Sequence, residues 1–472
     1  MMAFHLHRAP PVPEASISAP AVNYYSNKDP SPKVEDPSTE VLFPPGAAPG
    51  RRLISLDVLR AAAILLVLCG HVQFRAPDNA FLGGFWFFLR QTAVTGVDIF
   101  YVLSGFLVGG LLLSEHRATG SISLGHFFTR RAWRLWPSYF LAVLFGWQWY
   151  HHIHVMHDGV AVQGVSLRDM WPFFLHVQNY YDIEQHKFGA GAVMQTWTVA
   201  SLVHFYILVA LLLTGLAAMG RRAMGAIPWI SAGLFVACFF LRWQAAPIKA
   251  SDYDAWKNYF PTHLRLDEPM FGVLLAYLVV HRREALERVM TRGWWMVALL
   301  SLAAFGPAAF RKDEGPRFLC IWGYTLASVG AGGLILCAWW LEQRRVARMM
   351  AQPEVGRVGV LGLVARGFGW VGVWSYSIYL WHQPLIEHLA FRARQFVGNH
   401  VVKWDSPLHY TAVVLMFIVM SVALGAVMYY LVELPFLILR EQLMRGGVPR
   451  LPIGAGFPIA AVKSGPAPRP LS

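Results

Sequence analysis

Residues 51–72 read RRLISLDVLRAAAILLVLCGHV, a stretch that is long and apolar enough to cross a bilayer as one helix. Within this stretch lie Asp57, Arg60 and His71. At about 100° per residue, a helix projects these three side chains within about 60° of one another. An ionisable side chain in a membrane span costs roughly 2.5–3.5 kcal/mol, so three of them on one stripe predict a helix that faces a protein-lined cavity.

Asp57 and Arg60 also have a simpler interpretation. At i,i+3 spacing near the end of the span, they can neutralise each other and extend to the membrane interface. His71 lies about 21 Å further along the helix axis, too far to pair with Asp57. A lone histidine within a membrane helix is a functional candidate by default.

The composition predicts an all-α, polytopic membrane protein. Of the 472 residues, 56% are hydrophobic and only 14% are charged, and the mean hydropathy is +0.42; soluble domains carry about 25% charged residues. The net charge is +13, but Arg and Lys cluster between apolar runs, which indicates membrane topology and not nucleic-acid binding. We expect neither disulfides nor a metal site, because all the cysteines lie in apolar runs without metal-site spacing: Cys69, Cys238, Cys320 and Cys337.

About ten transmembrane helices are predicted, at 53–74, 84–114, 136–156, 197–219, 226–243, 267–281, 294–310, 318–341, 371–391 and 409–432. Arginine-rich connections alternate with arginine-poor ones, which predicts a cell inner (plasma) membrane protein with both termini cytoplasmic. Residues 1–50 are predicted to be a disordered cytoplasmic tail, 51–440 the transmembrane domain, and 441–472 a Pro/Gly-rich cytoplasmic tail.

Polar residues and glycines interrupt the second predicted span. It contains Gly96, Asp98, Ser104 and Gly105, which predict a broken or re-entrant segment whose backbone faces a cavity. A serine beside a glycine in a membrane helix is more often a packing residue than a nucleophile, so the simpler interpretation of Ser104 is packing.

Two connections are predicted to lie at the membrane boundary. The loop at 157–196 is rich in Trp, Tyr, His and Gln, which is typical of an interfacial lid over a cavity. His263, Arg265, Asp267 and Glu268 precede or begin the sixth span. Because positions i, i+2 and i+4 do not share one helix face, we expect this cluster to form a turn.

Residues 127–137 read FFTRRAWRLWP and place Arg130, Arg131 and Arg134 before the third span. At i,i+3 spacing, Arg131 and Arg134 can present two guanidinium groups on one side, an arrangement that suits a phosphate or pyrophosphate. An anionic ligand on the cytoplasmic side is one interpretation; ordinary positive-inside topology, with contacts to lipid phosphates, is the other.

Six motifs occur in the order and spacing of the acyltransferase-3 family of integral-membrane O-acyltransferases: LDVLRAAAILLVLCGH, GVDIFYVLSGFL, FTRRAWRLWPSYF, QTWTVASLVHFY, THLRLDEPMFGVLLAY and SYSIYLWHQPLI. The chain resembles this family over about residues 51–440. The resemblance implies transfer of an acyl group, commonly acetyl, from cytosolic acyl-CoA to a hydroxyl of an extracytoplasmic glycan or similar acceptor. Acyl-CoA would be a co-substrate, with no bound cofactor.

The resemblance also implies roles for particular residues. His71 matches the catalytic histidine, and Asp57 and Arg60 match the pair in the first helix. Arg131 and Arg134, with Arg130 beside them, match the arginines that bind the donor. The expected acceptor and cavity residues are Asp98, Ser104, Trp197, His204, His263, Arg265, Asp267, Tyr379, Trp381 and His382.

Some of these residues have simpler interpretations. His204 on an apolar face is expected to be a hydrogen-bonded core residue. The aromatic and polar residues at the ninth span are typical of membrane-interface anchors, with acceptor contact as the alternative. They are Tyr376, Tyr379, Trp381 and His382.

The chain departs from the family in its fourth helix, where the family usually reads W-S-L-x-x-E-E-H/Q-F-Y. Residues 197–206 read WTVASLVHFY, so Leu202 and Val203 replace both acidic residues. Another acid, such as Asp98, Asp267 or Glu268, could substitute, the acceptor could differ, or the protein could be inactive. Two other functions therefore stay open: a transporter for a glycan or lipid precursor, and a non-catalytic relative.

Overall fold

The computed structural model describes residues 53–71, 80–152, 156–157, 160–161, 166–181, 190–307, 316–351, 360–400 and 406–444. The tails expected at 1–50 and 441–472 lie outside these ranges, except that 441–444 continue the last helix. The last described helix therefore ends at Met444, and the expected domain boundaries stay predictions.

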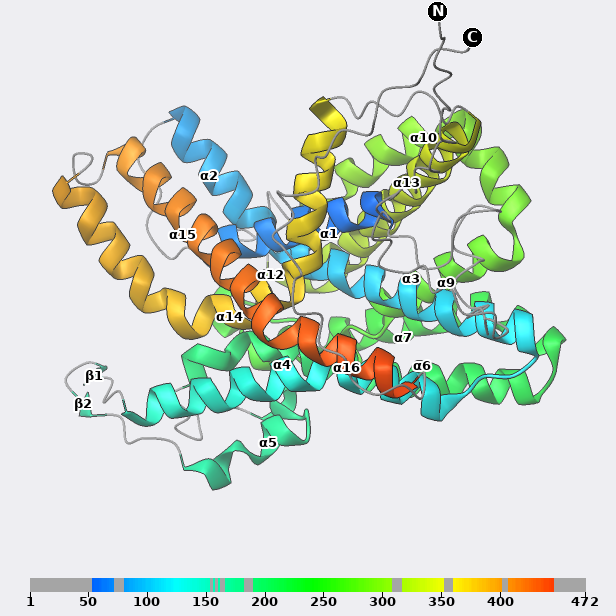
Figure 1. Ribbon diagram of the computed structural model, residues 1–472, viewed down its shortest axis with the longest axis horizontal. Coiled ribbons are helices and arrows are strands. Elements are labelled where there is room, and N and C mark those ends of the chain that lie inside the picture. The colour runs from blue at the N-terminus through cyan, green and yellow to red at the C-terminus, as the bar shows by residue number, and fades with distance from the viewer. Residues whose placement is uncertain are drawn as a thin grey trace, which may run out of the picture.

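The described chain is built almost entirely of helices (Figure 1). The longer helices are α1 Ile54–Gly70, α2 Ala80–Thr92, α3 Val94–Thr119, α4 Leu124–His152, α6 Trp197–Ala218, α7 Ile227–Ala245, α9 Asp267–His281, α10 Arg283–Ala304, α13 Tyr324–Ala351, α14 Val360–His400, α15 Pro407–Met428 and α16 Leu434–Met444. The short α-helices are α5 Trp171–Phe174, α8 Ala255–Asn258 and α12 Pro316–Phe318. Short 3₁₀ segments lie at Leu167–Met170, Gln178–Tyr180, Ala190–Thr196, Arg221–Ala226, Ala250–Asp252 and Thr262–Leu264, and π-helical turns at Leu319–Gly323 and Tyr429–Glu433. The strand pairing within the described residues is a two-residue antiparallel ladder between β1 Met156–His157 and β2 Val160–Ala161.

Each of the ten predicted ranges falls on a helix. By length and composition, five helical stretches of the described chain can cross a membrane: Phe81–Thr119, Val193–Ala218, Arg221–Ala245, Leu319–Arg348 and Pro407–Met444. Large apolar side chains are exposed on α7, α10 and α15, among them Trp229, Phe240, Leu300 and Val419. Such a surface suits lipid and not water, which supports a multi-pass membrane protein. The number ten stays a prediction.

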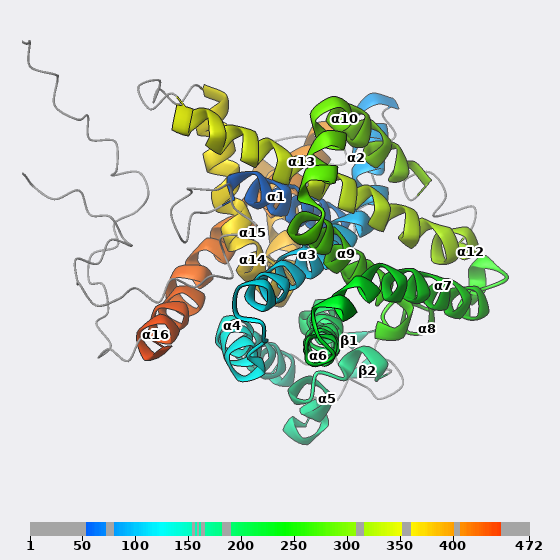
Figure 2. The same ribbon diagram turned by 90° about the vertical axis from the view of Figure 1, so that its right-hand side faces the viewer.

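Helix α3 lies at the centre of the bundle, with α1, α9 and α13 packed against it (Figure 2). It is buried along most of its length because its residues are apolar or small on every side. Gly105 of α3 and Gly272 of α9 allow the two backbones to approach closely. A Cβ atom on Gly105 would lie 1.8 Å from the carbonyl oxygen of Pro269, and one on Gly272 would lie 2.0 Å from that of Val102.

The predicted break in the second span is present only in part: α2 ends at Thr92 and α3 begins at Val94, but Ala93 between them keeps α-helical backbone angles. Gly96, Asp98, Ser104 and Gly105, from which the break was predicted, lie within the uninterrupted α3. Threonine hydroxyl groups donate hydrogen bonds to backbone carbonyl oxygens there. The Thr95 hydroxyl donates to the carbonyl of Thr92 at 2.6 Å, and the Thr92 hydroxyl donates to that of Phe88 at 3.0 Å. Within a membrane such bonds offset the cost of interrupting a helix.

We expect Gly272→Ala to lower the thermal stability of the detergent-solubilised protein, because the added methyl group forces α9 away from α3. Overpacking of this kind typically costs about 1–3 kcal/mol. Gly233→Ala in α7 is the control, because a Cβ atom there meets nothing within 4 Å. A Gly272→Ala protein that melts at the temperature of the control would contradict the close packing of α3 on α9.

Candidate functional site

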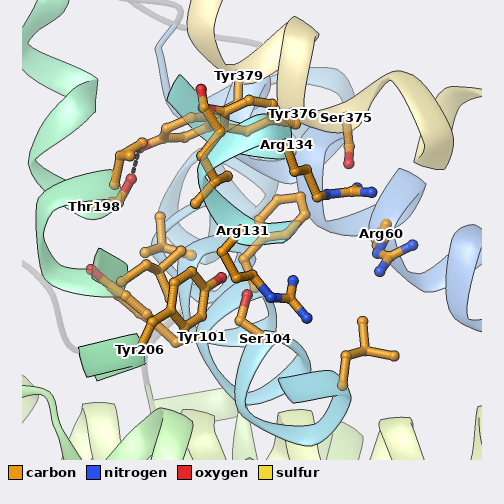
Figure 3. A pocket seen from close by; sticks show the side chains of 16 residues that line it. Arg60, Tyr101, Ser104, Arg131, Arg134, Thr198, Tyr206, Ser375, Tyr376 and Tyr379 are labelled. Atoms are coloured by element: carbon orange, nitrogen blue, oxygen red, sulfur yellow. Dashed lines mark hydrogen bonds between the residues drawn. The ribbon is translucent and has the colours of Figure 1, made fainter. Parts of the chain in front are cut away.

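A cavity of about 130 Å³ lies between α1, α3, α4, α6 and α14 (Figure 3). Its lining combines charged, hydroxyl-bearing and apolar side chains. The lining residues are Arg60, Val97, Phe100, Tyr101, Ser104, Leu107, Arg131, Arg134, Leu135, Thr198, Val199, Leu202, Tyr206, Ser375, Tyr376 and Tyr379. Ser104 therefore lines the cavity, as expected of a cavity residue, and its role stays a prediction.

The guanidinium groups of Arg60, Arg131 and Arg134 lie on one side of the cavity (Figure 3). Arg131 stacks over the Tyr206 ring at 5.5 Å. Arg131 precedes the span expected at 136–156, and burial lowers its pKa to about 10, with further lowering by Arg134, Arg130 and Arg60. No carboxylate among the described residues lines the cavity. Three guanidinium groups on one side, with no carboxylate among the described lining residues, favour an anion in the cavity.

Asp57 and Arg60 form the expected ion pair, with 2.8 Å between Nη1 of Arg60 and Oδ1 of Asp57. The Asp57 side chain is 7% exposed and that of Arg60 is 24% exposed. Both interpretations of the pair are therefore correct in part: the two residues neutralise each other, and Arg60 also reaches the cavity. Arg130 is half-buried on α4 and is not among the described lining residues.

The Thr198 and Tyr379 side chains lie on the opposite side of the cavity, whereas Ser104 and Ser375 lie beside the arginines (Figure 3). The Thr198 hydroxyl donates to the Tyr379 oxygen at 2.8 Å, and the Tyr379 hydroxyl donates to the carbonyl of Gln195 at 2.7 Å. Trp381 and His382 are 3% and 1% exposed. The interpretation of this group as interface anchors is therefore wrong for Trp381 and His382, which lie in the protein interior.

His71 follows directly after α1 and has a defined tautomer. Its Nδ1 lies 2.8 Å from the carbonyl oxygen of Val67. A carbonyl oxygen only accepts, so Nδ1 carries the proton and Nε2 presents a lone pair, as a general base requires. The His71 ring packs edge-on against that of His382 at 4.7 Å, and His382 lies 5.8 Å from the ring of Tyr379. The rings of His382 and Tyr379 therefore lie between His71 and the cavity. His71 itself is not among the described lining residues.

The expected cavity residues Asp98 and Arg265 belong instead to a buried ionic cluster. The Arg265 guanidinium donates to Asp98 and, at 2.8 Å and 3.0 Å, to both oxygens of Glu268. All three side chains are at most 1% exposed. Four aromatic rings surround the guanidinium, those of Tyr101, Trp197, Tyr259 and Tyr324.

A second buried ion pair lies beside this cluster. Arg242 donates to the two oxygens of Asp267 at 3.0 Å and 2.7 Å. The predicted turn is confirmed for His263 and Arg265, which lie in and directly after the 3₁₀ turn Thr262–Leu264, but Asp267 and Glu268 belong to the first turn of helix α9. The acids considered as substitutes for the missing fourth-helix carboxylate are thus bound to arginines. Leu202, one of the two departures from the family pattern, lines the cavity itself.

The remaining expected residues lie around the lid. Nδ1 of His204 is 2.8 Å from the Thr262 hydroxyl, so the expected hydrogen bond is present, but the residue is half-buried and not part of the core. His263 is exposed, and its Nδ1 lies 3.2 Å from the Tyr180 hydroxyl. Trp197 packs on Phe260 at 4.7 Å.

The described parts of the predicted lid are bound to the bundle. Gln178 donates to the Tyr139 hydroxyl at 2.9 Å, and Asn179 donates to the Thr262 hydroxyl at 2.8 Å. His176 stacks on Tyr139 at 4.6 Å, and burial lowers its pKa to about 4, so the ring is neutral. The lid residue Gln195 accepts the hydrogen bond from Tyr379 of the cavity.

Several site residues were missed by sequence reasoning. Thr198, Leu202 and Tyr206 recur every four residues on one face of α6, a spacing visible in the sequence. Glu433 is the only carboxylate in the apolar stretch 407–440. Its side chain is buried and accepts a hydrogen bond from the Ser377 hydroxyl at 2.8 Å. The positive charges of Arg134 and Arg60 both act on this carboxylate.

Comparison with known proteins identifies the family of the chain. A family model described as an acyltransferase domain, acyltransferase-3, matches residues 53–426. A Bacillus subtilis (strain 168) protein, provisionally named peptidoglycan O-acetyltransferase YrhL, is 26% identical over 398 residues, covering 82% of this chain and 55% of that protein. O-acetyltransferase OatA of Staphylococcus aureus (strain NCTC 8325 / PS 47) is 23% identical over 413 residues, covering 84% of this chain and 58% of that protein.

The chain thus spans little more than half the length of the curated relatives that it matches. No solved structure matches it significantly. The family model covers most of the chain, including α1 with His71, the arginines of α4 and the cavity face of α6. The chain therefore belongs to the acyltransferase-3 family.

Proposed function

We propose that the protein is a membrane O-acyltransferase that moves an acyl group, in the simplest case acetyl, from acyl-CoA to a hydroxyl group of an extracytoplasmic glycan or similar acceptor. The observation that carries the proposal is the cavity with arginines on one side, joined through Tyr379 and His382 to the lone pair of His71. The relatives named as O-acetyltransferases support the acyl group and the hydroxyl acceptor.

The arginine side of the cavity suits the donor. Arg131 and Arg134 can each form two hydrogen bonds to a phosphate oxygen pair, which a diphosphate such as that of CoA supplies. Both residues precede a predicted span on its arginine-rich side, so the proposal places the donor in the cytosol. The thioester end would then extend past Thr198 and Tyr379 towards His71.

His71 is the proposed general base. Its Nε2 takes the proton of the acceptor hydroxyl while the hydroxyl oxygen attacks the thioester carbonyl. The carbon–sulfur bond breaks, and the thiolate leaves and takes up a proton to give free CoA. The products are an ester of the acceptor and a thiol, and no metal or redox step is required.

Donor binding and chemistry can be tested in two steps. Desulfo-CoA, which cannot carry an acyl group, should raise the melting temperature of the solubilised protein. Envelope polysaccharide from a strain lacking the gene should lose an ester-linked acyl group in mass spectrometry. Binding without any lost ester would contradict the enzyme and favour a transporter or a non-catalytic relative; loss of neither would contradict the whole proposal.

We expect the double variant Arg131→Lys/Arg134→Lys to raise the apparent donor KM by about tenfold or more. Lysine keeps the positive charge but lacks the planar fork, and a hydrogen bond to a charged group contributes roughly 1.5–3 kcal/mol. Insertion should be normal, because the charge that sets topology is retained.

The matched control is Arg221→Lys/Arg222→Lys, an exposed doublet on another connection. Donor dependence and membrane topology are measured for both variants. An unaltered donor KM in the Arg131/Arg134 variant would show that these arginines serve topology alone.

A further inference from the structure

A second basic site lies beside the arginine side of the cavity, where α16 packs on α4. The two helices meet at Trp133 of α4 and Phe436 of α16, whose ring centroids are 6.1 Å apart. Arg440 follows Phe436 by four residues and Arg130 precedes Trp133 by three, so each arginine shares a helix face with its aromatic neighbour. The helix contact thereby brings Arg440 towards Arg130.

Arg440 is poorly neutralised by the protein. Its side chain is 18% exposed, and its Nη2 lies 3.5 Å from an oxygen of Glu441, whose own side chain is 46% exposed. Its Nε is buried without a hydrogen-bond partner among the described residues. A buried donor without a partner is costly, so this group is well suited to an acceptor supplied by a ligand.

Like charges gather around Arg440. The positive charges of Arg130 and Arg134 both act on its guanidinium, and the Glu441 carboxylate opposes their effect on Arg440. Arg134 also lines the cavity, so the second basic site and the cavity share a boundary at this residue. A ligand with two anionic groups can therefore occupy both places at once.

We propose that Arg440, with Arg130, binds the 3′-phosphate on the ribose of the CoA donor. The subsite lies beside the cavity that holds the diphosphate, and the paired rings of Trp133 and Phe436 offer an apolar wall for the adenine. The inference rests on the proposed function, because it assigns one end of the proposed donor. A phosphomonoester carries more charge than a phosphodiester, which matches a site with several guanidinium groups.

The chemistry of this site would also suit a lipid phosphate, so the test has to separate the two sources. The affinities of CoA and 3′-dephospho-CoA are measured for the full-length protein in detergent and in nanodiscs with and without anionic phospholipid. Wild-type protein should bind CoA about tenfold more tightly than 3′-dephospho-CoA, as expected for one charge-assisted contact. In Arg440→Gln this ratio should fall towards one, while the affinity for 3′-dephospho-CoA stays at the wild-type value.

Unchanged 3′-dephospho-CoA binding shows that the Arg440→Gln protein is folded around an intact cavity. Arg440→Lys provides a milder second variant, expected to show an intermediate ratio. Arg348→Gln, an exposed arginine on α13, is the control and should keep the wild-type ratio.

Each other outcome overturns the proposal. A wild-type protein that binds both nucleotides equally has no 3′-phosphate site, although the proposed function would stand. Equal weakening of both ligands in Arg440→Gln would indicate a general effect of charge or packing. A ratio that depends on anionic phospholipid and not on Arg440 would assign the site to lipid. Failure of the wild-type protein to bind either nucleotide would remove the donor proposal and this inference together.

Discussion

His71→Gln and His71→Asn are each expected to lower the rate of acyl transfer by about 10²–10⁴-fold, the usual contribution of a general base. Nδ1 of His71 is bonded to the Val67 carbonyl, so Nε2 is the atom available to take a proton. Either amide can still donate a hydrogen bond, but neither can act as a base at neutral pH. The loss of rate would therefore report the missing proton acceptor.

The measurement is acyl transfer by purified protein in vesicles, together with membrane insertion and melting temperature. His281→Gln is the control, an exposed histidine stacked on Tyr277 at 4.8 Å and far from the cavity in sequence. Insertion and melting temperature should match the wild type in all three variants. A His71→Gln protein that transfers acyl groups at the wild-type rate would show that His71 is not the base.

Arg265→Gln is expected to destabilise the protein by about 3–5 kcal/mol, the usual cost of removing one partner from a buried ion pair. Asp98 and Glu268 would be left facing each other without a cation, and neither side chain is more than 1% exposed. The aromatic rings around the guanidinium would also lose a cation–π partner. The expected result is a low yield of folded protein, or a much lower melting temperature.

Two further variants separate the loss of charge from a general sensitivity to mutation. Arg283→Gln removes a pair with Glu287 whose side chains are 27% and 38% exposed, together with a hydrogen bond to Gln343 and a contact over the Trp339 ring. It should cost about 1–2 kcal/mol, less than the loss of a buried pair. Adding Asp98→Asn and Glu268→Gln to Arg265→Gln removes the stranded charges and should recover part of the stability. If Arg265→Gln melts like Arg283→Gln, the cluster is not a major source of stability.

Local sequence determined those features that depend on neighbouring residues along the chain. Helical spacing was enough to predict the pairing of Asp57 with Arg60 and the shared side of Arg131 and Arg134. The spacing around His263 predicted the turn before α9, whereas the break expected from glycines and polar residues of the second span is reduced to the single residue Ala93 between α2 and α3. Apolar runs predicted helices in each of the ten ranges. These features arise from backbone geometry and hydrophobicity, which act over a few residues.

Only the tertiary structure decided which helices meet, and therefore which polar side chains become partners. Asp98 and Arg265 are far apart in sequence but pair because α3 and α9 approach closely at Gly105 and Gly272. The same packing binds the candidate acids to arginines away from the cavity lining, and Leu202 lines the cavity itself.

The contact of His71 with His382 depends in the same way on the packing of α1 against α14. Helical periodicity shows which face of a helix is polar. Which helix packs against that face depends on close contacts between helices, and the sequence of one helix carries no local signal for those contacts.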